Sequence, residues 1–124
     1  MIKPEDIRIE IIGYIESKFK EKADHFVMRE EESTVVIYDE YADGLYRIKE
    51  KDFIQVIFAF HRSNQAVLKG PTYDGTVKGV FASRSPYRPS SLGLTTVRLL
   101  SVDRLRLRVK GLDAIDGTPV LDIK

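Results

Sequence analysis

The feature that most constrains the fold is a series of short β-branched and apolar runs, which turn residues interrupt along the whole chain. The runs cover residues 7–15, 34–38, 53–60, 79–83, 94–102, 105–109 and 120–123. Short runs with this punctuation predict strands, and only residues 40–45, closed by Gly44, predict a helical turn. With no internal repeat and no linker, we expect one all-β domain, 1–124, folded as a small single-domain β-barrel with little helix.

The segments between these runs carry further expectations. Residues 16–29 lack a helical stripe and are predicted to form a long loop. Residues 64–75 contain a Gly-Pro and an Asp-Gly turn pair, which predict a connector. Residues 53–60 are almost continuously apolar, and such a run predicts a strand buried on both faces. Asp103-Arg104 is predicted to be a hairpin turn.

The composition excludes several kinds of site. The chain has 0 cysteines, so a disulfide framework, a thiolate zinc site and a cysteine nucleophile are excluded. His25 and His61 are the only histidines, and we therefore expect no multi-histidine metal site. No apolar run approaches the ~20 residues of a membrane-spanning helix, and the polar first residues lack the apolar core of a signal peptide. We expect a cytoplasmic protein without a metal or a membrane contact.

Charge is unevenly distributed, although the net charge is only +1. Residues 1–62 carry 10 Lys and Arg against 14 Asp and Glu, which gives −4, and residues 63–124 carry 10 against 5, which gives +5. A basic half favours a phosphate-bearing partner. The alternative is that basic and acidic strands interleave in the fold and cancel.

The first segment that could carry chemistry is KGVFASRSPYRPSSLG, at residues 78–93. Its two prolines predict a stiff, non-helical loop. Arg84 and Arg88 project from this loop, and guanidinium groups on a rigid backbone suit the binding of carboxylate or phosphate. The alternative is a surface loop whose arginines are only solvated.

The second segment is GLDAIDGTPVLDIK, at residues 111–124. Its Asp-Gly pair predicts a turn, and free N–H and carbonyl groups in an irregular loop can hold an adenine edge or a hydroxyl. The alternative is an ordinary connection between two strands, in which Asp113 and Asp116 cap turns.

Taken together, these two segments resemble the TsaA/TrmO family of tRNA methyltransferases. GVFASRSPYRPSSLGLT is similar to the family block GVFATRSP(H/F)RPNPIGLS, and GLDAIDGTPVLDIK is similar to GLDALDGTPVLDIKPY. Residues 12–15 and 53–62 also resemble two of the family's strands. The resemblance implies a β-barrel that acts as a homodimer, with S-adenosylmethionine bound near the subunit interface. It implies methyl transfer to N6 of threonylcarbamoyladenosine, next to the anticodon of tRNA.

The resemblance also implies the residues of the site. The expected cofactor contacts are His61, Arg62, Arg84, Leu94, Asp116, Gly117, Thr118 and Pro119. Three acceptors stay open for the proton that leaves N6, namely Asp116, Asp113 and Tyr87. Contacts to RNA are expected from Arg88 and from the alternating Arg104, Arg106 and Arg108. The alternative for that strand is a solvated outer face, and the alternative for His61 is a residue of the barrel rim.

The chain departs from the family pattern in three places. Ser90-Ser91 replaces an Asn-Pro pair, Gln55 replaces a histidine, and no Pro-Arg-Gln block follows the first strand. The nearest stretch to that block, which is implied to contact the cofactor, is residues 25–29. These departures keep two alternatives open. One is a non-catalytic barrel that binds RNA or a nucleotide, and the other is a methyltransferase of small molecules.

Overall fold

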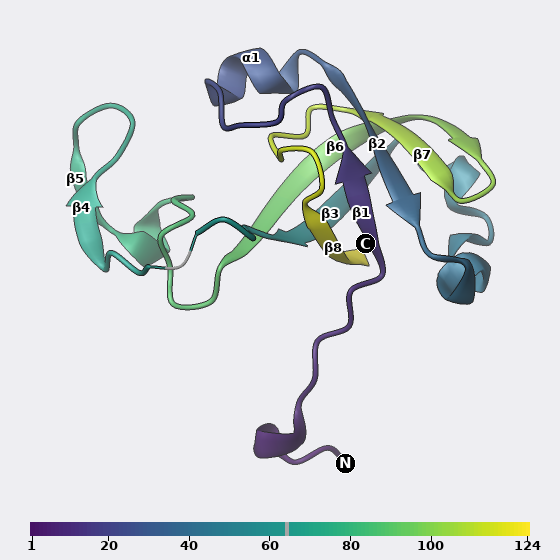
Figure 1. The fold of residues 1–124 in the computed structure, drawn as a ribbon, viewed down its shortest axis with the longest axis horizontal. Helices are drawn as coiled ribbons and strands as arrows, with labels where there is room; N and C mark the ends of the chain where they lie inside the picture. The colour runs from purple at the N-terminus through teal and green to yellow at the C-terminus, as the bar shows by residue number, and fades with distance from the viewer. Residues whose placement is uncertain (64) are drawn as a thin grey trace.

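The body of the computed structural model, which describes residues 1–63 and 65–124, is a closed barrel of antiparallel strands (Figure 1). The strands follow the order β1-β2-β7-β6-β3-β8, and β1 closes the barrel by pairing Gly13 with Val120 of β8. Their bounds are β1 (Gly13–Glu16), β2 (Glu32–Ile37), β3 (Phe53–Ala59), β6 (Leu92–Asp103), β7 (Arg106–Lys110) and β8 (Pro119–Ile123). The predicted all-β barrel is confirmed.

The core consists of every second residue of each strand, because successive side chains of a strand point to opposite faces. In β3, Ile54, Val56 and Phe58 are buried, whereas Phe53 and Gln55 are exposed. The prediction that residues 53–60 are buried on both faces is therefore wrong. An apolar run can line a barrel on one face only, and Phe53 and Gln55 lie on the outer face of β3, open to solvent.

The β6–β7 hairpin agrees with its prediction. Arg104, which directly follows β6, has a φ of 55°, the left-handed conformation of a tight turn. Leu107 and Val109 are fully buried, whereas Arg106 and Arg108, each of which directly precedes one of them, are exposed. The alternation of the sequence therefore does place the basic side chains on the outer face.

The strand predicted over 7–15 is mostly absent, because only Gly13–Glu16 pairs with neighbours. The preceding residues leave the barrel as an extended arm after a short 3-10 turn, η1 (Pro4–Asp6), and Ile7, Ile9 and Ile11 are exposed. The alternating pattern satisfies the local requirement of a strand, but a strand also needs a partner, and β2 and β8 do not extend alongside this arm.

Two further predictions, a loop over residues 16–29 and a strand over residues 79–83, are corrected. Residues 16–29 contain a helix, α1 (His25–Arg29). Asp24 is its N-cap residue, and the Asp24 side chain accepts a hydrogen bond from the Phe26 N–H. A helix of five residues is too short to show a helical period. The predicted strand 79–83 is instead a 3-10 turn, η4 (Val80–Ala82), which follows β5 (Val77–Gly79).

The connector predicted over 64–75 contains β4 (Lys69–Pro71), which pairs with β5 as a two-stranded sheet, and its first residue, Asn64, lies outside the described residues. The predicted helical turn over 40–45 is present as the 3-10 segment η2 (Asp39–Leu45), and η3 (Ile48–Glu50) follows it.

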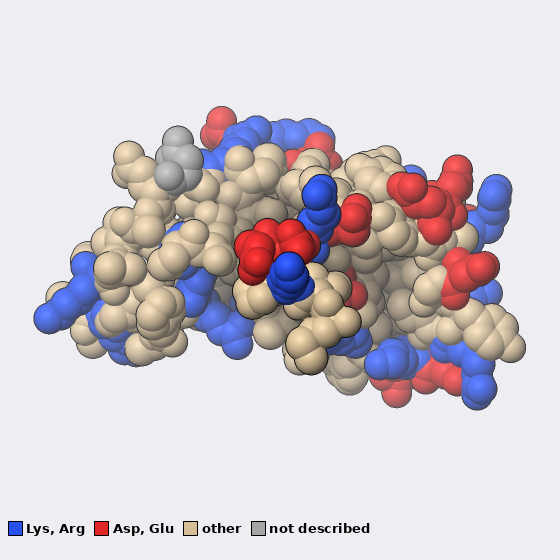
Figure 2. Space-filling view, turned by 90° about the horizontal axis from the view of Figure 1, so that it is seen from below, with Lys and Arg blue, Asp and Glu red and all other residues tan. Residues whose placement is uncertain are grey.

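Residues 61–63 and 65–91 form a lobe that stands beside the barrel, at the left of Figure 1. By sequence the lobe has five basic residues, Arg62, Lys69, Lys78, Arg84 and Arg88, and one acidic residue, Asp74. Its net charge is therefore 5 − 1 = +4, which leaves a net charge of +1 − 4 = −3 for the rest of the chain. Seen from below, the far left end of the molecule shows Lys and Arg side chains and no Asp or Glu (Figure 2). The positive charge is therefore concentrated in the lobe.

Candidate functional site

Two of the expected cofactor residues are joined by a hydrogen bond. The Arg84 Nη1 donates to the Leu94 carbonyl oxygen over 2.9 Å, across the turn between the proline-rich loop and β6. Arg84 is otherwise exposed. This bond holds one edge of a planar guanidinium in place, and the other N–H groups make no hydrogen bond within the described residues. Those groups are therefore available to a carboxylate or phosphate.

Arg88 has a different role from Arg84, although both project from the same loop. Its Nη1 donates to the carbonyl oxygens of Ser83 and Ser85, at 3.2 and 3.0 Å, and its side chain is half-buried. Bonds of this kind stabilise the loop conformation. The guanidinium that was expected to contact RNA thus has part of its donor capacity used within the protein.

The turn that carries His61 and Arg62 packs against this loop. The Phe60 N–H donates to the Ser91 carbonyl oxygen over 2.8 Å, and the Ser63 hydroxyl donates to the Pro86 carbonyl oxygen over 3.1 Å. His61 and Arg62 themselves are exposed. The structure therefore brings both residues to the same end of β3 and β6 as Arg84 and Leu94.

Ser91, which departs from the family pattern, strengthens this packing. Its hydroxyl donates to the Ser63 carbonyl oxygen over 3.3 Å. A proline has no hydroxyl and could not make this bond. The replacement thus exchanges a backbone restraint for a hydrogen bond between the two loops.

The turn of residues 116–119 is fixed to β1 by its own backbone. The N–H groups of Asp116, Gly117 and Thr118 donate to the carbonyl oxygens of Phe19, Ile15 and Ile115, over 2.8, 2.7 and 3.2 Å. Gly117 has a φ of 80°, which glycine adopts without strain. These three donors are therefore engaged inside the protein, whereas the sequence suggested that they could hold a ligand.

The Asp116 side chain also serves this attachment. Its Oδ2 accepts from the Lys20 Nζ over 2.8 Å and its Oδ1 accepts from the Ser17 N–H over 2.9 Å. These bonds hold the pKa of the Asp116 carboxyl below its ordinary value, the Lys20 bond contributing most. A carboxylate with a lowered pKa is a weak proton acceptor.

Asp113 connects three elements near the same end of the barrel. Its Oδ1 accepts from the Thr95 hydroxyl over 2.9 Å, and its Oδ2 accepts from the Arg29 Nη2 over 3.0 Å. Thr95 follows Leu94 in β6, and Arg29 ends α1. Sequence reasoning missed both partners. One signal could have pointed to Arg29: it lies in residues 25–29, the stretch most similar to the Pro-Arg-Gln block that the resemblance implied to contact the cofactor.

The basic strand β7 lies away from these residues. Arg108 pairs opposite Ser101 and Arg106 opposite Asp103 in the β6–β7 ladder. At ~3.3 Å per residue, Ser101 and Asp103 are about 23 and 30 Å along β6 from Leu94. Arg106 is bonded to Glu16, and Arg108 to Glu32 over 2.6 Å. Basic and acidic strands thus interleave in the barrel, and only Arg104 of this expected RNA track has no ion pair within the described residues.

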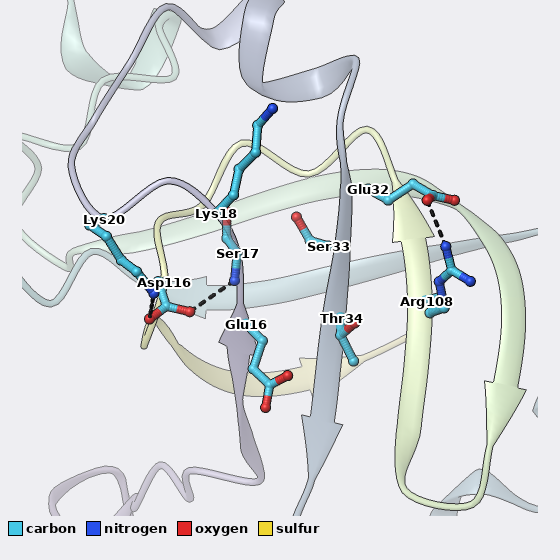
Figure 3. Close-up of a pocket in the computed structure, with 9 residues that line it drawn as sticks. All are labelled: Glu16, Ser17, Lys18, Lys20, Glu32, Ser33, Thr34, Arg108 and Asp116. Carbon is cyan, nitrogen blue, oxygen red and sulfur yellow. Dashed lines mark hydrogen bonds and ion pairs between the residues drawn. The ribbon is translucent and has the colours of Figure 1, made fainter.

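A polar hollow of about 620 Å³ lies over β1, β2 and β7 (Figure 3). Its cations are all paired within the protein: Lys20 with Asp116, Arg108 with Glu32, and Lys18 with Glu31. Such a surface offers no uncompensated charge to an anion. A second hollow, of about 710 Å³, lies beside η2 and η3 and is lined by none of the expected site residues.

In the part of the chain that the structure describes, no three His, Cys, Asp or Glu side chains gather as a metal site would require. No helix of the described residues combines the length and apolarity needed to cross a bilayer.

Comparisons with known proteins agree on one family. The model of the tRNA-methyltransferase O N-terminal domain matches residues 14–124. An S-adenosyl-L-methionine-binding protein of Archaeoglobus fulgidus is 40% identical over 117 residues, covering 91% of this chain and 84% of that protein. The tRNA (adenine(37)-N6)-methyltransferase of Mus musculus is 37% identical over 92 residues, or 71% of this chain and 21% of that protein.

The fold agrees with solved structures as well. The crystal structure of TrmO from Pseudomonas aeruginosa has a TM-score of 0.75 and 30% sequence identity to this chain. The match covers 95% of this chain and 54% of that one, so the chain spans about half the length of this solved relative.

Proposed function

The chain belongs to the tRNA-methyltransferase O family, and from this premise we propose that it is an S-adenosylmethionine-dependent methyltransferase acting on N6 of an adenosine in tRNA. The proposed substrate is threonylcarbamoyladenosine next to the anticodon. The observation that carries the proposal is the Arg84–Leu94 hydrogen bond, which joins two expected cofactor residues and holds an exposed guanidinium in place. A protein that acts on tRNA in this way would work in the cytoplasm.

The chemistry of the gathered side chains fits S-adenosylmethionine. The cofactor has a carboxylate, which suits the guanidinium groups of the exposed Arg84 and Arg62. Leu94, which is exposed and bonded through its carbonyl oxygen to Arg84, offers an apolar contact to the rest of the cofactor. The donors of residues 116–118 are engaged, so we propose that this turn contributes shape and its carbonyl groups rather than N–H bonds.

When bound, S-adenosylmethionine supplies an electrophilic methyl group on a positively charged sulfur. The residues of this chain would orient the acceptor in line with that methyl group and keep bulk water away. Among the three proton acceptors that the sequence left open, we propose Tyr87, whose hydroxyl oxygen would accept the N6 proton while the hydroxyl releases its own proton to solvent. Its side chain is exposed and its hydroxyl makes no hydrogen bond within the described residues, whereas both oxygens of Asp113 and Asp116 are already bonded.

The decisive measurement is calorimetry with S-adenosylmethionine and its demethylated product, followed by incorporation of labelled methyl into tRNA. We expect both molecules to bind, and we expect methyl transfer only to tRNA that carries threonylcarbamoyladenosine. Absence of binding at millimolar concentration would refute the proposal. Binding of tRNA without methyl transfer would favour the non-catalytic barrel. Methylation of small molecules alone would favour a methyltransferase of small molecules.

We also propose that the protein is a homodimer in which the lobe covers the partner subunit. The lobe exposes Val67, Leu68, Val77 and Phe81, and the Phe81 side chain is 82% exposed. Contiguous exposed apolar side chains mark surfaces that another protein covers. A second copy would also enclose the Arg84 end of the barrel, which the single chain leaves open to solvent.

The Phe81→Ser variant tests the dimer. Burial of a phenylalanine contributes about 1.5–3 kcal/mol, and a symmetric interface loses it twice. We therefore expect the dimer dissociation constant to rise at least ~100-fold, measured by analytical ultracentrifugation. Phe53→Ser, on the outer face of β3, is the control and should leave the dimer intact. A wild-type monomer, or a dimer that only Phe53→Ser disrupts, would contradict the proposed lobe interface.

A further inference from the structure

Three aromatic side chains meet where α1 faces the tip of the β4–β5 hairpin. The ring centres of His25 and Phe26 are 4.1 Å apart, those of His25 and Tyr73 5.5 Å, and those of Phe26 and Tyr73 6.4 Å. The Phe26 and Tyr73 ring planes stand at 79° to each other. We name His25, Phe26 and Tyr73 the aromatic corner.

The aromatic corner is open to solvent. The Phe26 side chain is 61% exposed and the Tyr73 side chain is 83% exposed, whereas His25 lies half-buried between them. Aromatic rings that serve only packing are normally buried, because their burial contributes the stabilisation. Rings held near one another by contact and still exposed are the arrangement of a surface that binds a flat molecule.

The aromatic corner is connected to the proposed cofactor residues through α1. Phe26 and Arg29 lie on this one short helix, and Arg29 donates to Asp113 over 3.0 Å. Asp113 in turn accepts from Thr95, the residue after Leu94. Movement of α1 is therefore restrained by the loop and the strand that carry the proposed site, and α1 occupies the stretch where the family's Pro-Arg-Gln block was expected.

Tyr73 belongs to the lobe, whose net charge of +4 by sequence favours a phosphate-bearing ligand. The one acidic residue of the lobe, Asp74, interacts with Lys78, and its pKa is lowered to about 2, chiefly by the Thr72 hydroxyl. The apolar side chains proposed for the dimer, Val67, Leu68, Val77 and Phe81, do not include these rings.

We propose that the aromatic corner stacks a purine ring, an inference that rests on the proposed function. A planar base that lies flat on one of two perpendicular rings presents its edge to the other, and both contacts are favourable. Adenine is present in the cofactor and in the acceptor nucleotide, so either can be the source of this base.

The variants Phe26→Leu and Tyr73→Leu test the proposal, since leucine keeps an apolar side chain but removes the ring. Tyr46→Leu is the matched control, because Tyr46 is also 83% exposed but lies beside η3. Binding is measured separately for S-adenosylhomocysteine and for an RNA hairpin with the anticodon-loop sequence. A stacked base is worth roughly tenfold or more in affinity, and we expect a loss of that size for one of the two ligands, which identifies the source of the base.

A spectroscopic measurement separates stacking from a merely structural role. Ring currents should shift the adenine H2 and H8 resonances of the bound ligand upfield in the wild type and the control, but less in the two corner variants. Unchanged affinities and unchanged shifts for both ligands would overturn the inference. If the wild type binds neither ligand, the proposed function fails. In that case the binding of adenosine monophosphate tests the aromatic corner by itself. Binding that Phe26→Leu and Tyr73→Leu weaken would support the inference, and absence of binding would overturn it.

Discussion

Replacement of Gly13 by alanine should reduce the free energy of unfolding by about 3 kcal/mol or more, enough to unfold a marginally stable domain. A Cβ at this position would lie 2.0 Å from the Val36 carbonyl oxygen. That oxygen belongs to the backbone of β2, and Gly13 also pairs with Val120 in β8. Neither strand can move away without opening the barrel where it closes, so the clash cannot be relieved by a side-chain rotation.

The sign of this effect is opposite to the ordinary one, because alanine in a strand interior is usually more stable than glycine by ~0.5–1 kcal/mol. Gly44→Ala is the control, since a Cβ there would meet nothing within 4 Å. Urea unfolding followed by circular dichroism measures both variants. If Gly13→Ala unfolded within about 0.5 kcal/mol of the wild type, the tight closure between β1 and β2 would be wrong.

Arg84→Ala should weaken the binding of S-adenosylmethionine by about 10- to 150-fold. A hydrogen bond to a charged group contributes ~1.5–3 kcal/mol, and the substitution also removes the bond that fixes the Leu94 carbonyl oxygen. Arg84→Lys keeps the charge but not the planar donors, and we expect an intermediate loss. Calorimetry measures the affinity of each variant.

Arg98→Ala provides the control for Arg84, because Arg98 is an exposed arginine of the same strand as Leu94, opposite Phe53 in the β3–β6 ladder. It should bind the cofactor as the wild type does. An Arg84→Ala affinity within twofold of the wild type would show that Arg84 only shapes the loop, and the proposed contact with the cofactor would have to be abandoned.

The alternating strands and their turns were predictable because they depend on neighbours in sequence. Leu107 and Val109 are buried and Arg106 and Arg108 exposed, as a period of two requires. The same local reasoning failed for residues 7–11, which alternate equally well. Whether an extended segment becomes a strand depends on a partner, and the partner comes from elsewhere in the chain.

The candidate site shows the same division. The two long blocks at residues 79–95 and 111–124 identified the family, and family membership implied Arg84 and Leu94. Nothing in the sequence indicated that Arg84 donates to Leu94, or that Arg88 folds back onto its own loop. Backbone acceptors carry no residue identity, so bonds to them leave no pattern in the sequence.

By itself, the sequence determined the fold class, the family and the outward face of β7, because these follow from local periodicity and from long matching blocks. Only the tertiary structure decided which charges remain available. Arg108 is paired with Glu32 and Arg29 with Asp113, partners 76 and 84 residues apart, and the aromatic corner joins α1 to the hairpin. Pairs at such separations are set by the register with which the barrel closes, and no local propensity encodes that register.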